Sequence, residues 1–146
     1  ASDVYKRQAV VPDQPLSTHK ARQAIPQHIP HQDAVFNASR TALYVGAVIS
    51  GNYQYLNAAL EDRLHQPYRI PLITGTEAVF EAAKANGAYG AIISGAGSTL
   101  MAYADPEKDC DIIAAAMTDA FEKYGQRSTA HILKLDFNGA REKEHS

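Results

Sequence analysis

The sequence has no tryptophan and a single cysteine, and it contains no long apolar run. One cysteine, Cys110, cannot form an internal disulfide, which is typical of proteins from a reducing compartment. No stretch reaches the roughly 20 apolar residues that a membrane-spanning helix needs, and the N-terminus lacks the apolar centre of a signal peptide. We therefore expect a cytoplasmic protein without a membrane partner.

An excess of positive charge is also lacking. Lysine and arginine number 14 against 16 acidic residues, which gives a net charge of −2. A nucleic-acid-binding domain would need a basic face and aromatic side chains on its central strands. Tyr89 and Tyr103 are too few for that role, so we expect no nucleic-acid partner.

The sequence offers little to a metal ion. His28 and His31 have a spacing that could align two imidazoles on one helix, but Pro30 between them breaks the helix. No nearby cysteine completes a site of the usual ligand set. We expect no metal site.

What the sequence does have is enough apolar material for one ordinary domain, with 146 residues of which 45% are hydrophobic. Residues 1–8 show no periodicity and precede an abrupt apolar start at Ala9, so we expect them to be a non-native extension and exclude them from the fold. Val10 and Val11 look like the end of a strand whose beginning is missing. The domain is then assigned to residues 9–146, and the sequence is expected to be a fragment.

The first half of that domain is predicted to be helical after its opening strand. Ser17 is a candidate N-cap for a short helix that Pro26 closes. A longer helix is predicted over residues 32–50, ended by Gly51. Its apolar face is defined by positions that step by three and four, namely Val35, Ala38, Ala42, Val45 and Ile49. Helical spacing then continues from Leu56 to Leu64, until Pro67 stops it.

The second half alternates between helices and strands. Thr74 and Glu77 form a candidate capping box for a helix that ends at a left-handed Gly87. Apolar runs at residues 88–94 and 99–104 predict two strands joined by a glycine loop, and residues 105–107 predict the start of another helix. Alternation from Thr129 to Phe137 predicts a last strand. The order indicates an α+β fold, a ferredoxin-like antiparallel sheet with helices on one face and extra helices after the first strand.

Three segments of the sequence contain candidate ligand-binding residues. Thr18 and Arg22 lie four apart at a helix start, where a hydroxyl, a guanidinium and free amides suit a phosphate or carboxylate; a capped surface helix with a solvated arginine is the alternative. Arg69 follows Pro67 and Tyr68, which would stiffen the backbone that presents it; a basic residue at a helix end is the alternative. The string Ser94, Gly95, Ala96, Gly97, Ser98 and Thr99 allows backbone amides to approach an anion, but it could also be a flexible hairpin connection.

Taken together, several such strings in a fixed order carry a resemblance. They are the Val-Pro-Asp-x-x-Leu-Ser-Thr-x-x-Ala-Arg string that ends at Arg22, Asp33–Asn37, Glu61–Arg69 and Ser94–Thr99. The chain, from about Ala9 to near Arg141, resembles the C-terminal half of bacterial homoserine kinases, which belong to the GHMP kinase superfamily. The family's nucleotide loop, of the form Pro-x-x-x-Gly-Leu-Gly-Ser-Ser, occurs nowhere in the sequence.

The resemblance implies ATP-dependent phosphorylation of L-homoserine, on the path to threonine, with ATP and Mg²⁺ bound by an N-terminal kinase domain that this sequence lacks. It implies that Thr18 lies near the transferred phosphoryl group and that Arg22 and Arg69 hold the substrate carboxylate. The string Ser94 to Thr99 is similar to the third GHMP motif, with Ser98 where many relatives have proline. The chain alone is therefore expected to bind neither cofactor and to be inactive.

Two other functions remain open at this point. One is a non-catalytic ferredoxin-like module that binds an amino acid for regulation, which would use both arginines but give the glycine loop no phosphate. The other is a different GHMP small-molecule kinase, since other members share the third motif. An exposed apolar surface beside the site would also be consistent with a homodimer.

Overall fold

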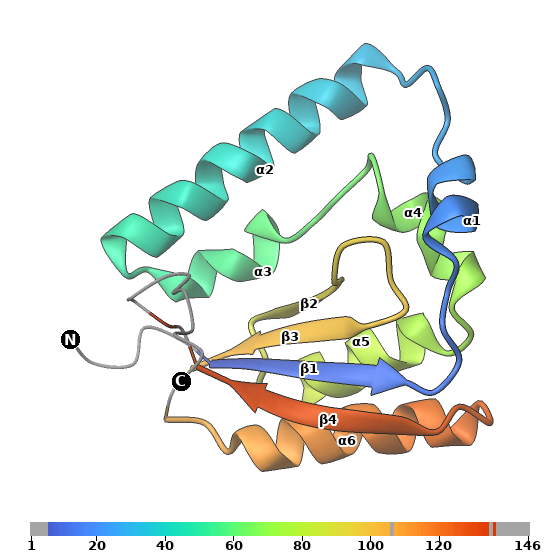
Figure 1. The fold of residues 1–146 in the computed structure, drawn as a ribbon. Coiled ribbons are helices and arrows are strands. Elements are labelled where there is room, and N and C mark those ends of the chain that lie inside the picture. Colours follow the sequence, from blue (N-terminus) through green and yellow to red (C-terminus); the bar gives the residue numbers. More distant parts are fainter. Residues whose placement is uncertain (1–5, 106, 135, 137–146) are drawn as a thin grey trace, which may run out of the picture.

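The computed structural model describes residues 6–105, 107–134 and 136. Its four strands form one antiparallel sheet in the order β2-β3-β1-β4 (Figure 1). The strands are β1 (Lys6–Pro12), β2 (Gly90–Ile93), β3 (Leu100–Ala104) and β4 (Ser128–Leu133). This is the strand order of a ferredoxin-like sheet, so the α+β fold class is confirmed.

The helices divide into an inserted group and a packed pair. The inserted group follows β1 and comprises α1 (Thr18–Gln23), α2 (His31–Ser50), α3 (Leu56–Ala59) and α4 (Gln66–Arg69), with the 3₁₀ turns Tyr53–Tyr55 and Ile70–Leu72. The packed pair is α5 (Thr76–Ala85) and α6 (Cys110–Lys123). The extra helices thus fall after the first strand, as the sequence predicts.

The main core lies between one face of the sheet and the pair α5 and α6. Val10, Leu100 and Ala102 point to this side from the strands and are fully buried. The helices contribute fully buried side chains from their inner faces, namely Val79, Ala83, Ile113, Met117 and Phe121. Because these positions recur every four residues along each helix, both helices present an apolar stripe to the sheet.

In the described part of the chain, the inserted helices pack on the opposite face of the sheet over β3. Tyr103 of β3 packs there with Ala47 and Leu56 of the inserted helices, and the ring of Tyr44 stands edge-on to it at 6.5 Å. Over β1 and β4 the same face carries the exposed side chains Val11 and Leu133. The prediction that the helices lie on one face of the sheet therefore holds for α5 and α6. The inserted helices α2 and α3 instead fold over the β2 edge.

The strand β1 begins earlier than the sequence indicates. Lys6, Arg7 and Gln8 pair with β3 and β4 in register, so excluding residues 1–8 from the fold was wrong for these three. Their polar side chains do not predict a strand, but they form one because strand formation depends on neighbours in the sheet as much as on residue type.

Helix starts were the least accurate predictions. Pro67 lies inside the first turn of α4 and does not stop a helix, and the segment before it is a loop. The proposed capping box fails as well, because α5 begins at Thr76 after a left-handed Gly75 and has no side-chain cap. The last helix begins at Cys110, capped by Asp109, and not at residues 105–107. Pro106, Leu135 and Phe137 lie outside the described residues.

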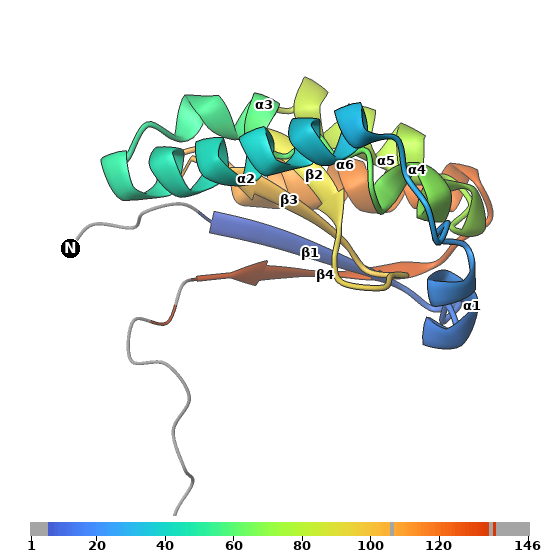
Figure 2. The ribbon, with the colours of Figure 1, turned by 90° about the horizontal axis from the view of Figure 1, so that it is seen from above.

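The helix α2 is correctly predicted in extent, and Gly51 ends it with a left-handed φ of 72°. Its apolar stripe is not where an amphipathic helix would place it. All five positions of that stripe face solvent, and Ile49 is 82% exposed. The side of α2 that packs on the domain carries Phe36, Asn37, Arg40 and Tyr44 instead. Figure 1 shows α2 as a long helix along the upper edge of the molecule, and Figure 2, seen from that side, shows it in front of β2 and β3.

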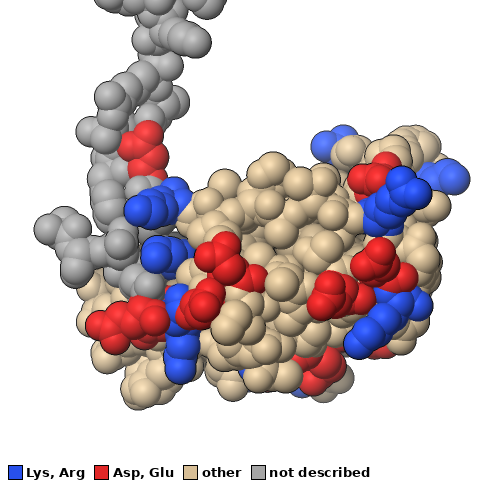
Figure 3. Space-filling model, turned by 90° about the horizontal axis from the view of Figure 1, so that it is seen from below, with Lys and Arg blue, Asp and Glu red and all other residues tan. Residues whose placement is uncertain are grey.

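Charge is distributed without a dominant sign. Figure 3 shows acidic and basic side chains mixed at both ends of one face, around an uncharged centre. None of the described helices is long and apolar enough to cross a membrane.

Candidate functional site

A cavity of about 540 Å³ opens between α1, α2, the loop before α4 and the end of β2. Five of the residues predicted to form a site line it, namely Thr18, Arg22, Arg69, Gly95 and Ala96. They come from segments up to 78 residues apart in the sequence, which the fold brings to one place. The volume is large enough for a small metabolite.

The first wall of the cavity is α1. Ser17 caps this helix by accepting a hydrogen bond from the amide of Lys20 at 3.5 Å, as predicted. Thr18 and Arg22 follow on one face, four residues apart, and both are exposed. Within the described residues the Arg22 guanidinium has no hydrogen bond or ion pair, so its charge is available to a ligand.

Arg69 is held in place by two backbone carbonyls. Its Nη1 donates to the carbonyl oxygen of Gly95 at 2.7 Å, and its Nε donates to that of Ala21 at 3.4 Å. These contacts tie α4 to the glycine loop and to α1. Since the described part of the chain supplies no partner for Nη2, this end of the guanidinium is presented in a fixed orientation.

The glycine loop connects β2 to β3 as a tight turn. The Ser94 amide donates to the Thr99 carbonyl at 2.9 Å, and the Gly97 amide donates to the Ser94 carbonyl at 3.0 Å. Gly97 has a φ of +89°, and a Cβ there would lie 2.8 Å from Ile73, so glycine is needed for both conformation and space. Gly95 and Ala96 line the cavity, whereas Ser98 lines a separate small pocket beside Leu16.

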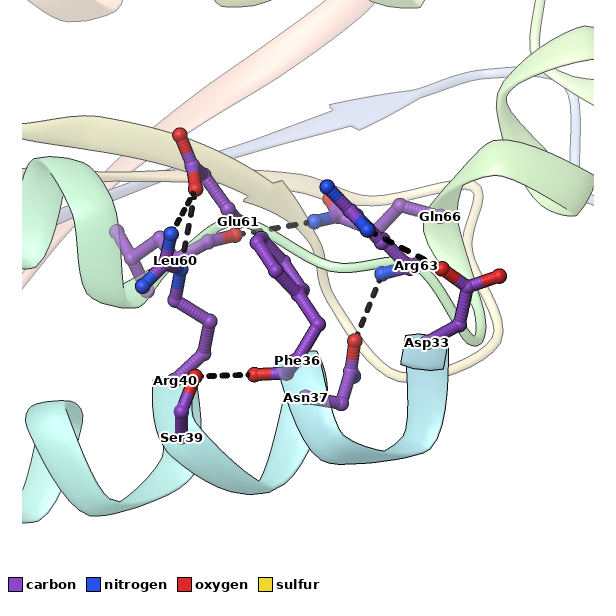
Figure 4. Close-up of polar contacts among 9 residues, drawn as sticks. All are labelled: Asp33, Phe36, Asn37, Ser39, Arg40, Leu60, Glu61, Arg63 and Gln66. Carbon is purple, nitrogen blue, oxygen red and sulfur yellow. Dashed lines mark hydrogen bonds and ion pairs between the residues drawn. The ribbon is translucent and has the colours of Figure 1, made fainter. Parts of the chain in front are cut away.

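The two other strings of the sequence resemblance contact each other. Arg40 forms an ion pair with Glu61 at 2.9 Å, and Arg63 forms one with Asp33 at 3.2 Å (Figure 4). The guanidiniums of both arginines lie over the ring of Phe36, at 4.3 and 3.8 Å. We call this set of contacts between α2 and residues 60–66 the α2 brace.

At the centre of the α2 brace are two side chains that sequence reasoning gave no role. Asn37 donates to Asp62 at 2.6 Å and accepts from the Arg63 amide at 2.8 Å. Asp62 also accepts from the backbone amides of residues 64, 65 and 66. Partial burial alone would raise the pKa of Asp62, but these hydrogen bonds outweigh it and hold the pKa below its ordinary value. The signal that could have found them is their place inside the quoted strings.

Gln66 completes the wall between the brace and the glycine loop. Its side chain donates to the Leu60 carbonyl at 3.3 Å and accepts from the Ile93 amide at 3.0 Å. Ile93 is the last residue of β2, directly before the loop. The cavity therefore combines two available guanidiniums with a framework of directional hydrogen bonds, which is suited to a small anionic ligand. No cluster of three or more metal-ligating side chains occurs among the described residues.

Comparison with known proteins places this arrangement in a family. The family model for the C-terminal domain of GHMP kinases matches residues 43–123. The chain belongs to this family and corresponds to the C-terminal domain of its members. Arg69 and the glycine loop lie inside the matched segment, whereas Thr18 and Arg22 precede it.

The chain is also similar to individual proteins with known names. The chain is 47% identical over 129 residues to a homoserine kinase of Picosynechococcus sp. and 44% identical over 130 residues to one of Microchaete diplosiphon. These matches cover 88% and 89% of the chain but 42% of each relative, so the chain spans about two fifths of their length. A crystal structure of a homoserine kinase from Cytophaga hutchinsonii has the same fold, with a TM-score of 0.86 at 24% identity over 89% of this chain and 41% of that one.

Proposed function

We propose that this chain is the substrate-clamping domain of a homoserine kinase, which transfers the γ-phosphoryl group of ATP to the side-chain hydroxyl of L-homoserine. The product is O-phospho-L-homoserine, and the step belongs to threonine biosynthesis. One observation carries the proposal. Arg69, anchored by the carbonyls of Gly95 and Ala21, lines the same metabolite-sized cavity as Arg22, which has no partner among the described residues.

The roles of the residues follow from the charge of the substrate. Arg22 and Arg69 bind the homoserine carboxylate, because a fixed guanidinium loses little rotamer entropy when it forms a bidentate pair. Thr18, one helical turn from Arg22, lies near the phosphoryl group in transfer. The glycine loop closes the site beside the phosphates through Gly95 and Ala96. Phosphoryl transfer depends mainly on such positioning and on charge neutralisation.

ATP and Mg²⁺ belong to the proposed reaction, but the described residues do not fit them. They provide no metal-ligand cluster, and the sequence contains no nucleotide loop of the family's form. In this proposal an N-terminal kinase domain binds the nucleotide and metal, and this chain alone is inactive. A cytoplasmic location and a homodimer remain predictions.

The test is a coupled ATP-turnover assay with L-homoserine. The chain is assayed alone and after fusion to the N-terminal region of the Picosynechococcus homoserine kinase. We expect turnover only in the fusion, and a loss of at least about a hundredfold in kcat/KM for homoserine in Arg22→Ala and Arg69→Ala. Arg127→Ala, at an exposed arginine outside the lining of the cavity, is the matched control and should retain full activity.

Three other outcomes lead to different conclusions. Turnover by the chain alone would contradict the predicted inactivity. Homoserine binding by the chain without turnover in a folded fusion would favour the amino-acid-binding module. Preference of the active fusion for another alcohol would indicate a different GHMP small-molecule kinase.

A further inference from the structure

Asp62 is an unusually well satisfied carboxylate for a loop residue. Its Oδ1 accepts from the Asn37 side chain at 2.6 Å and from the Leu64 amide at 2.9 Å. Its Oδ2 accepts from the amides of His65 and Gln66. A carboxylate offers about four lone-pair sites. All are used, so Asp62 lines the cavity without an oxygen left to bind a ligand.

The backbone amides that donate hydrogen bonds to Asp62 lie at the start of α4. A helix of one turn is unstable in isolation, because forming its first turn fixes several dihedral angles for a single hydrogen bond. Here the carboxylate supplies acceptors to three consecutive amides, and Asn37 ties that carboxylate to the long helix α2. The position of α4 is therefore set by Asp62.

The helix α4 in turn carries the groups that form the wall of the cavity. Gln66 reaches the Ile93 amide from its first position, and Arg69 reaches Gly95 and Ala21 from its last. A rotation of α4 would break these contacts together. Hydrogen bonds thus lead from Asn37 through Asp62 to the first residue of α4, and the helix itself carries Arg69 at its other end.

We propose that Asp62 is a positioning residue that fixes the orientation of the Arg69 guanidinium and thereby sets the affinity of the cavity for a carboxylate ligand. The identity of that ligand as homoserine rests on the proposed function. The orientation of Arg69 does not, and it can be measured on the chain without any ligand.

Three variants separate this role from simple stabilisation. Asp62→Asn keeps the shape but turns an amide group toward the Asn37 amide group, so two donors face each other. The exchange of the two residues, Asn37→Asp with Asp62→Asn, restores an acceptor for that amide and for the Arg63 amide, and loses only the contact to Leu64. Asp109→Asn is the control, because Asp109 also caps a helix, accepting from the amides of residues 111 and 112, but lies outside the lining of the cavity.

The first measurement is the Nε–Hε resonance of Arg69 in ¹⁵N NMR spectra of the chain. We expect a resonance displaced from those of exposed arginines in the unsubstituted chain and in Asp109→Asn, collapsed onto them in Asp62→Asn, and recovered in the exchange variant. The second is homoserine affinity, followed by titration in the same spectra. Asp62→Asn should weaken it by about tenfold or more, as expected when a binding group is misplaced, and Asp109→Asn should not.

The two proposals fail in different ways. An unchanged Arg69 resonance in folded Asp62→Asn overturns the positioning role, whatever happens to affinity. No homoserine binding by the unsubstituted chain, with the resonance shift intact, counts against the proposed function and leaves the positioning role supported. If Asp62→Asn does not fold, the exchange variant decides, since a folded exchange variant with a collapsed resonance also overturns the inference.

Discussion

Helices α6 and α2 are both apolar at every third or fourth position, yet they are attached to the domain by different forces. In α6 the apolar stripe faces the sheet, and Ile113, Met117 and Phe121 are fully buried. In α2 the corresponding stripe faces solvent, with Val35 55% and Ile49 82% exposed. The domain side of α2 is held by the ion pairs and hydrogen bonds of the α2 brace and by a small aromatic cluster.

The difference teaches that periodicity identifies an apolar stripe but not its partner. Burial of apolar surface is non-directional, and it does not depend on the charge state of a side chain. The α2 brace consists of directional contacts to charged groups, whose strength depends on pH and on salt. The two attachments should therefore respond to different changes.

The largest effect is expected from truncation in α6. Phe121→Ala removes a fully buried ring from the main core and should lower the free energy of unfolding by about 3–5 kcal/mol. Ile112→Ala on the same helix is the control, because Ile112 is 53% exposed. Urea denaturation followed by circular dichroism measures both. Equal losses in the two variants would contradict the assignment of the buried face.

The core between the sheet and α6 also contains a polar side chain that should lower the free energy of unfolding. Gln8 is fully buried on β1, and within the described residues neither its Nε2 nor its Oε1 has a hydrogen-bond partner. Burying such an amide unpaired costs about 1–3 kcal/mol. Gln8→Leu, of similar volume, should raise the free energy of unfolding by about 1–2 kcal/mol, whereas Gln54→Leu at an exposed site should not. A lower stability of Gln8→Leu would mean that the amide has a partner.

The α2 brace should weaken in acid while α6 does not. The pKa of Asp62 is lowered in the folded state, so folding favours its ionised form. That contribution is complete above the ordinary value of 3.8 and is lost as the pH falls through the lower folded pKa. Amide exchange at residues 64–66 should accelerate over this window relative to α6. In Asp62→Asn, about 1 kcal/mol less stable at neutral pH, the acceleration should be absent.

The sequence was sufficient for the fold class and for the order of helices and strands along the chain, because alternation and glycine turns are local signals that the sheet reinforces. Of the residues that line the cavity it singled out Thr18, Arg22, Arg69, Gly95 and Ala96, but it gave Asn37 and Asp62 no role. It failed where contacts outside the apolar pattern decided a local structure. Pro67 is predicted to stop a helix, but Asp62 accepts hydrogen bonds from the amides before it, and a helix begins there. Gln8 is predicted to lie in a non-native extension, but it pairs with β3 and β4.

The smallest effect is expected from the exposed stripe of α2. Ile49→Ser removes a side chain that is already 82% exposed, so it should change the free energy of unfolding by less than about 0.5 kcal/mol. Ala47→Asp, on the packed side of the same helix, is the contrasting variant and should be strongly destabilising, since Ala47 is 2% exposed. A loss of more than about 1 kcal/mol in Ile49→Ser would exceed what a surface site can lose. It would show that the stripe is covered in solution. Sedimentation at several concentrations would then tell whether a second copy covers it, because an interface between copies makes stability depend on protein concentration.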